Sequence, residues 1–201
     1  MSRTVSLSKN YDEALSAARE TVAAEGILVY PTDTLYGLGC NALSEKAVGR
    51  IYGIKKREAG KPLSILVADH AMLLQYCEVS AAQERVLHAL LPGPYTFILE
   101  LRKKMPTSKT MEVGVRVPEH MFMRQVSKEI SLPIVTTSAN ISGEKDAAAL
   151  KDIDKAVAAK ADLLIDGGTC QYAHGSTVID LVRMKVLRKG AMREGDRIEF
   201  G

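Results

Sequence analysis

The first sixty residues contain two stretches of helical periodicity with a short apolar run between them. Apolar residues recur at helical spacing from residue 11 to residue 22. Residues 27–30 (ILVY) are all hydrophobic and predict a short buried strand, which Pro31 ends. The helical pattern returns after Ser44 and is expected to end near residues 54–56.

The later patterns add more strands than helices. Further helices are expected around Asp69, from Ser80 and over residues 152–160. In the run VGVRV, three valines alternate with Gly114 and Arg116, so the valines are expected on one face of a strand and Arg116 on the other. The predicted strands are residues 63–68, 95–102, 113–117, 133–137 and 162–166, then TVIDLV (177–182) and KVLRK (185–189). This mixture predicts an α/β fold with a mixed sheet and packed helices, in a single domain over residues 1–201.

Composition narrows the class of protein without identifying it. Hydrophobic residues make up 46% of the chain and charged residues 25%, which is typical of a soluble globular protein. The formal net charge of +3 is compatible with anionic partners but does not require them. No apolar run approaches the length that spans a membrane, and the N-terminus has no apolar leader segment, so we expect a cytoplasmic protein without a membrane partner.

The cysteines and histidines do not suggest a metal site. The three cysteines lie far apart and form no CxxC, which predicts reduced thiols and no zinc motif. The four histidines are scattered along the chain. Motifs for a phosphate-binding loop, a dinucleotide fold, a serine nucleophile or a zinc protease are also absent. If the protein is an enzyme, we expect it to act by positioning and electrostatics.

Four polar stretches follow or end predicted strands, where α/β proteins place their sites. They are PTDTLYGLG (31–39), KKREAGK (55–61), TTSANISG (136–143) and HGST (174–177). In the first of these, residues 32–34 are expected to point outward beyond the buried strand. TTSANISG offers four hydroxyls and an amide, which suit either a turn at the end of a strand or a wall that hydrogen-bonds a small polar ligand.

KKREAGK has two interpretations. Its cations can lie at a solvated helix end, where each gains about 0.3–1 kcal/mol from the helix dipole. Alternatively, Lys55, Arg57 and Lys61 can converge on one phosphate group, because Gly60 allows the loop to fold back. Three converging cations repel one another unless an anion lies between them.

Taken together and in this order, these stretches and others along the chain resemble the YrdC family of threonylcarbamoyl-AMP synthases. The residues that carry the resemblance are YPTDTLYGLG, the Lys-x-Arg of IKKR, GKPL, LLPGPYTFIL, VGVRVP, TTSANISG, DGG, STVIDL and VLRKGA. They extend from about residue 27 to residue 190, and two of them lean toward the related YciO branch. The resemblance implies a twisted mixed sheet with helices around a basic cavity.

The resemblance also implies an activity and its partners. The family makes threonylcarbamoyl-AMP and pyrophosphate from L-threonine, bicarbonate and ATP, with Mg²⁺ carried by the nucleotide. A partner complex then transfers the threonylcarbamoyl group to an adenosine of tRNA. Some members are also described as binders of double-stranded RNA.

Matching the motifs one by one places family roles on this chain. The positions that match catalytic or nucleotide-binding residues are Lys55, Arg57, Lys61, Asn140 and Arg188. The positions that match threonine-binding residues are Thr34, Arg116, Ser138 and Ser176. No residue of the chain is expected to bind a resident metal.

Three functions remain open from the sequence. The first is the synthase, and the second is a non-catalytic protein that binds structured RNA through a basic concave surface. The third is a protein that senses or hydrolyses ATP with another amino acid. A synthase predicts a few cations inside a closed pocket, whereas an RNA-binding protein predicts a broad exposed basic face.

Overall fold

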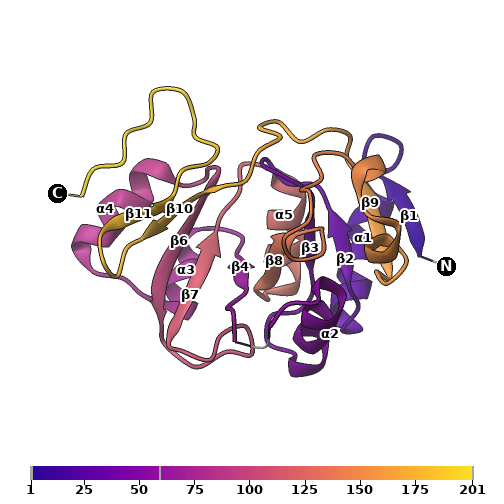
Figure 1. Cartoon of the computed structure of the whole chain (residues 1–201), viewed down its shortest axis with the longest axis horizontal. Helices are drawn as coiled ribbons and strands as arrows, with labels where there is room; N and C mark the ends of the chain where they lie inside the picture. Colours follow the sequence, from indigo (N-terminus) through magenta and orange to yellow (C-terminus); the bar gives the residue numbers. More distant parts are fainter. Residues whose placement is uncertain (1, 59, 201) are drawn as a thin grey trace.

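A mixed sheet of eleven strands runs through the protein. The computed structural model describes residues 2–58 and 60–200. The strand order is β1-β9-β2-β3-β8-β4-β7-β6-β10-β11, with β5 paired to β6. The strands are β1 (Arg3–Ser6), β2 (Leu28–Tyr30), β3 (Gly37–Gly39), β4 (Ser64–Leu66), β5 (Cys77–Glu78), β6 (Tyr95–Leu101), β7 (Glu112–Arg116), β8 (Ile134–Ser138), β9 (Leu163–Asp166), β10 (Thr177–Asp180) and β11 (Lys185–Arg188). Figure 1 shows β1 and β11 near opposite ends of the molecule, with the N-terminus beside β1 and the C-terminus at the other end.

The helices connect these strands and cover the sheet. They are α1 (Tyr11–Ala23), α2 (Glu45–Lys55), α3 (His70–Tyr76), α4 (Ala81–Leu90), α5 (Met121–Ile130) and α6 (Lys155–Ala158), with a 3-10 turn η1 at Leu150–Asp152. Polar side chains fix where several of them begin. Ser44 Oγ accepts a hydrogen bond from the Ala47 amide at 3.1 Å, and Ser80 with Gln83 forms a complete capping box. None of the helices in residues 2–58 and 60–200 is long and apolar enough to cross a membrane.

The sheet has a hydrophobic core on each face. In β2, Leu28 and Tyr30 belong to the core beneath α1 and α5, whereas Val29 belongs to the other core. This alternation follows from the two-residue period of a strand. The pairing is parallel between some neighbours, such as β6 and β10, and antiparallel between others, such as β6 and β7. The predicted mixed α/β fold is therefore confirmed.

Several elements differ from the sequence expectation. The helix α5 has no predicted counterpart, because its N-cap residue, His120, makes no side-chain capping bond and gives no start signal. Its apolar face instead packs on α1 through Phe122, Met123 and Val126. The segment at 152–160 was predicted as one helix, but η1 and the four-residue helix α6 occupy this region.

Candidate active site

A cavity of about 300 Å³ lies on one face of the sheet, over β6, β7, β8 and β10. Thr96 and Ile98 of β6 line the cavity, whereas Phe97 between them lies in the core on the other face. In β7, Gly114 and Arg116 line the cavity while the alternating valines are buried in the same core, as the sequence predicted. Loops after β2, α2 and β8 complete the wall. The cavity is therefore lined by central strands of the sheet and by residues from three of the polar stretches found in the sequence. Gly175 and Ser176, from the fourth stretch, also line it.

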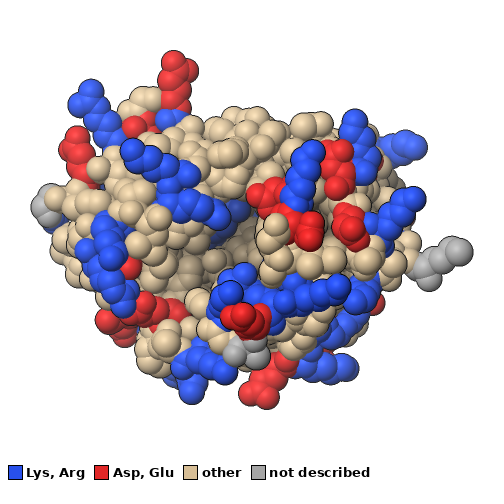
Figure 2. Space-filling model, viewed as in Figure 1, with Lys and Arg blue, Asp and Glu red and all other residues tan. Residues whose placement is uncertain are grey.

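Three arginines from separate elements line this cavity. Arg57 follows α2, Arg116 ends β7 and Arg188 ends β11. Among the lining residues, Asp146 is the only carboxylate, so the cavity has an excess of positive charge. Figure 2 shows a hollow in the middle of this face, with basic side chains above and below it and acidic side chains to its right. The guanidinium groups make the hollow suited to an anion that carries several oxygens.

Arg116 is oriented by a buried carboxylate. Its Nη2 donates to Oδ1 of Asp33 at 2.7 Å, and the two side chains are 10% and 1% exposed. The other carboxylate oxygen of Asp33 accepts a hydrogen bond from the Glu119 amide at 2.9 Å. Arg116 Nε is buried without a partner among the described residues. The pair fixes the guanidinium in the cavity wall and ties the PTDT loop to the end of β7.

The PTDT loop itself points inward, which corrects the expectation from sequence. Thr32, Asp33 and Thr34 are each only 2% exposed. Thr32 Oγ1 donates to the carbonyl of Leu35 at 2.7 Å and lies 3.0 Å from Thr34 Oγ1. These bonds turn the chain back toward the sheet, so the hydroxyl residues line the cavity while the loop remains buried.

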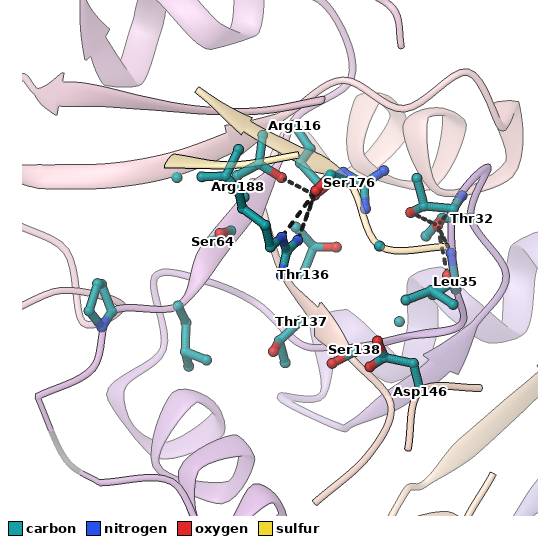
Figure 3. Close-up of a pocket in the computed structure, with 18 of the residues that line it drawn as sticks. Thr32, Leu35, Ser64, Arg116, Thr136, Thr137, Ser138, Asp146, Ser176 and Arg188 are labelled. Carbon is teal, nitrogen blue, oxygen red and sulfur yellow. Dashed lines mark hydrogen bonds between the residues drawn. The ribbon is translucent and has the colours of Figure 1, made fainter. Parts of the chain in front are cut away.

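Ser176 and Arg188 line another side of the cavity, away from the loop that carries Thr32 (Figure 3). Arg188 donates from Nη2 to the carbonyl oxygen of Ser176 at 2.9 Å, and its Nε donates to the same oxygen at 3.2 Å. Ser176 Oγ lies 2.8 Å from Thr96 Oγ1. Figure 3 shows Thr137, Ser138 and Asp146 across the cavity from this pair. Hydroxyl groups and guanidinium groups thus face each other over the space between the loops.

Lys55 lies beneath the SAN loop (residues 138–140), and neither Lys55 nor Asn140 of this loop lines the cavity. The Lys55 ammonium donates to the carbonyl oxygens of Ser138 and Asn140 at 2.6 and 2.8 Å, and to Asn140 Oδ1 at 2.9 Å. Burial lowers the pKa of Lys55 to about 8. The Asn140 amide group also accepts from Ser138 Oγ and donates to the Glu144 carbonyl and Asp146 Oδ1. The hydrogen bonds of both side chains therefore hold the backbone of the SAN loop in its conformation.

The structure separates the three cations that were predicted to converge on a phosphate, Lys55, Arg57 and Lys61. Arg57 lines the cavity, and its guanidinium donates to the carbonyl oxygens of Lys61 and Pro62 at 3.2 and 2.9 Å. Lys61 is exposed, pairs with Glu58 at 3.2 Å and is absent from the lining. Lys56 is exposed and caps α2 in the left-handed conformation. Six of the nine residues proposed from sequence thus line one cavity, namely Thr34, Arg57, Arg116, Ser138, Ser176 and Arg188.

Gly114 also lines the cavity, although it was not among the site residues predicted from the sequence. A Cβ atom at this position would lie 2.4 Å from Ser64 Oγ and 3.1 Å from Thr96 Cγ2. Glycine therefore lets β7 pass under the cavity without filling it. The sequence did contain a sign of this role. Gly114 lies between Val113 and Val115, so strand alternation puts it on the same face of β7 as Arg116.

The comparisons with known proteins decide the family. The family model described as "Sua5_yciO_yrdC: Telomere recombination" matches residues 20–190. The chain belongs to the Sua5/YciO/YrdC family. A relative from Methanocaldococcus jannaschii, named "Putative threonylcarbamoyl-AMP synthase", is 40% identical over 84% of this chain and 79% of its own length. The resemblance inferred from the nine motifs is thereby confirmed.

Solved structures of this family share the fold. P. abyssi Sua5 complexed with L-threonine is 32% identical, with a TM-score of 0.84 over 94% of this chain. The chain spans 57% of the length of that Sua5 chain. E. coli YciO is 28% identical with the same TM-score of 0.84, and the likeness covers 97% of this chain and 98% of YciO. The fold of this chain is therefore shared by both Sua5 and YciO.

Proposed function

We propose that the protein is a threonylcarbamoyl-AMP synthase, which joins L-threonine, bicarbonate and ATP and releases pyrophosphate. The observation that carries the proposal is the convergence of three arginines on one hydroxyl-lined cavity. The name of the M. jannaschii relative and the L-threonine bound to P. abyssi Sua5 support the same choice of substrates. The cavity volume falls within the range of small-molecule sites, roughly 300–1,000 Å³.

The reaction requires charge stabilisation more than a covalent nucleophile. Bicarbonate supplies CO₂ with loss of water, the threonine amine adds to this CO₂ and gives up a proton to form a carbamate, and a carbamate oxygen attacks the α-phosphorus of ATP. A new P–O bond forms while the bond from the α-phosphorus to the bridging oxygen breaks, and pyrophosphate leaves with that electron pair. Arginine remains charged at every physiological pH and offers paired donors to phosphate oxygens. This makes the protein a nucleotidyltransferase that acts by positioning and electrostatics.

We assign roles from the positions in the cavity. Arg57 and Arg188 contact the phosphate groups, and Arg116, held by Asp33, binds the threonine carboxylate. Hydroxyl groups of Thr34, Ser138 and Ser176 bind the remaining polar atoms of threonine. We assign Lys55 and Asn140 to positioning the SAN loop, and Lys61 to the exposed rim of the phosphate side.

Mg²⁺ enters this scheme as part of the nucleotide substrate. Magnesium prefers carboxylate and water oxygens, and Asp146 is the only carboxylate in the lining. Asp146 also accepts a hydrogen bond from Asn140 at 3.0 Å. One carboxylate does not make a cage, so an ion bound here would take its other ligands from the nucleotide phosphates and water.

The product is an activated carbamoyl group whose acceptor we propose to be a tRNA adenosine, reached through a partner complex. A non-catalytic RNA-binding role requires a broad exposed basic face. The face in Figure 2 instead carries acidic side chains directly beside the hollow. On this face the mixture of acidic and basic side chains thus favours the enzyme over the RNA-binding alternative.

The test is an incubation with ATP and bicarbonate together with each amino acid in turn, followed by measurement of pyrophosphate. We expect release that depends on threonine in the wild type and in Lys56→Ala, and none in Arg57→Ala. Release that is equal with every amino acid, or that needs none, contradicts the proposal and favours ATP hydrolysis.

A further inference from the structure

Two histidines that are far apart in the sequence meet on the helices α3 and α4. His70 Nε2 lies 3.3 Å from Glu84 Oε1, and His88 Nε2 lies 3.6 Å from the same oxygen. The two imidazole rings stack with their centroids 4.4 Å apart and their planes 29° apart. One ligand atom from each residue lies within 4.8 Å of the other two. None of the three residues lines the cavity described above.

The local structure holds all three side chains on one surface. Glu84 and His88 are four residues apart on α4, so they lie on the same face one helical turn apart. His70 is the first residue of α3, and Asp69 fixes this end through a hydrogen bond from the Met72 amide to its Oδ1 at 2.9 Å. The capping box at Ser80 fixes the start of α4 in the same way. Figure 1 places both helices in the half of the molecule that contains β6, β10 and β11.

The donor set and its spacing match those of a zinc site. Two imidazole nitrogens and one carboxylate oxygen are a familiar set of three protein ligands, with water as the fourth. Two atoms bound at usual distances to one tetrahedral zinc ion lie about 3.4 Å apart. The two distances to Glu84 Oε1 are already 3.3 and 3.6 Å. The His88 side chain is 64% exposed and free to adjust, and the same exposure admits a water molecule.

We propose that His70, Glu84 and His88 form a site for a divalent transition metal of the zinc type that joins α3 to α4. The site lies outside the cavity, so its metal stabilises the fold and takes no part in the proposed synthase reaction. His70 Nδ1 is buried and has no hydrogen-bond partner among the described residues. A second partner on the ligand imidazole usually contributes about 10–100-fold to affinity, so this site is weaker than a dedicated structural zinc site.

The competing interpretation is an ordinary surface cluster in which Glu84 accepts hydrogen bonds from the imidazoles. Zinc titration of the chelator-treated full chain separates the two. For the wild type we expect one zinc ion per chain by calorimetry. We also expect a melting temperature about 5–10 °C higher at a hundredfold excess of free zinc over the dissociation constant.

Three variants and one spectroscopic signature sharpen the test. His88→Gln removes an exposed ligand and should weaken zinc binding at least tenfold, with an unchanged melting temperature in chelator. His174→Gln removes an exposed histidine outside the cluster and should bind zinc like the wild type. Both variants keep the three buried cysteines, so thiol binding affects them equally. Bound Co²⁺ should give visible absorption typical of a four-coordinate site, which Glu84→Gln should abolish.

Either of two results overturns the metal site. One is a wild type that binds no zinc in the calorimeter at millimolar concentration. The other is a His88→Gln variant that binds zinc as tightly as the wild type and gains the same melting temperature.

Discussion

The buried pair between Asp33 and Arg116 makes the most quantitative prediction. We consider Asp33→Ala, which removes the carboxylate and leaves the guanidinium in place. Arg116 then loses its 2.7 Å partner, and the Glu119 amide loses its acceptor at 2.9 Å. Both the cavity wall and the PTDT loop depend on this carboxylate. The substitution should therefore lower both stability and the affinity for threonine.

Burial decides the size of the effect on stability. Exposed ion pairs contribute about 0–1 kcal/mol, whereas removal of one partner of a buried pair costs about 3–5 kcal/mol. The Asp33 and Arg116 side chains are 1% and 10% exposed, which places them in the second class. For a protein of this size, such a loss lowers the melting temperature by about 6–20 °C.

Chemical denaturation of four variants measures this effect. Arg19→Ala is the control, because Arg19 pairs with Glu129 at a similar distance of 3.0 Å but is 49% exposed. We expect Asp33→Ala to lose about 3–5 kcal/mol and the control to lose less than about 1 kcal/mol. Arg116→Met and the double variant complete a cycle. The double variant should lose less than the sum of the two single variants, because it leaves no unpaired buried charge.

A loss at Asp33→Ala no larger than at Arg19→Ala would refute the reasoning. Additive losses in the cycle would also refute it, because they would mean that the two charges do not interact. In the synthase assay, Asp33→Ala should raise the KM for threonine more than the KM for ATP.

Three further substitutions, with Lys56→Ala as a control, test other parts of the site. Arg57→Ala should abolish ATP-dependent turnover with a melting temperature close to that of the wild type, because among the described residues the Arg57 guanidinium bonds to two backbone carbonyls near the surface. Lys56→Ala should leave turnover unchanged. The pKa of Lys55 is about 8 in the folded protein and 10.5 for an ordinary lysine. Between these two pH values the unfolded chain binds more protons than the folded protein. The contribution of Lys55 to the free energy of unfolding therefore rises with pH. Denaturation should thus show the wild type gaining about 2 kcal/mol over Lys55→Met from pH 7 to pH 9.5, and a constant difference would contradict the low pKa. Gly114→Ala should lower the free energy of unfolding by about 1–3 kcal/mol and reduce the affinity for threonine, because the new Cβ atom would lie 2.4 Å from Ser64 Oγ. An unchanged affinity would mean that threonine binds elsewhere.

Strand periodicity and capping residues made much of the fold predictable. The alternation in VGVRV put Arg116 on the face opposite three valines, and that face lines the cavity. Ser44 and Ser80 marked the starts of α2 and α4 because their hydroxyls cap the first turn. By contrast, α5 is stabilised by its packing on α1 and lacks such a cap, so its start carried no local signal.

The division of roles within the site could not be read from the sequence. Lys55 and Arg57 are two residues apart at the end of α2, yet one is buried beneath the SAN loop and the other lines the cavity. The left-handed turn at Lys56 separates them, and residue types alone do not specify that turn. The pairing of Asp33 with Arg116 joins residues that are 83 positions apart, so it depends on the sheet topology.

The meeting of His70 and His88 was hidden for a similar reason. Their spacing matches no zinc motif, and each histidine alone is more typical of a structural or solvated side chain. Only the packing of α3 beside α4 brings both imidazoles to Glu84.

The central proposal is that one cavity binds ATP and threonine for the same reaction. Mass spectrometry of the product formed from ATP, threonine and ¹³C-bicarbonate tests this most directly. We predict a threonylcarbamoyl-AMP that carries the ¹³C label, made in equal amounts by wild type and Lys56→Ala and missing from Arg57→Ala. Pyrophosphate release without a labelled adenylate, or a labelled adenylate from Arg57→Ala at the wild-type rate, would contradict the account.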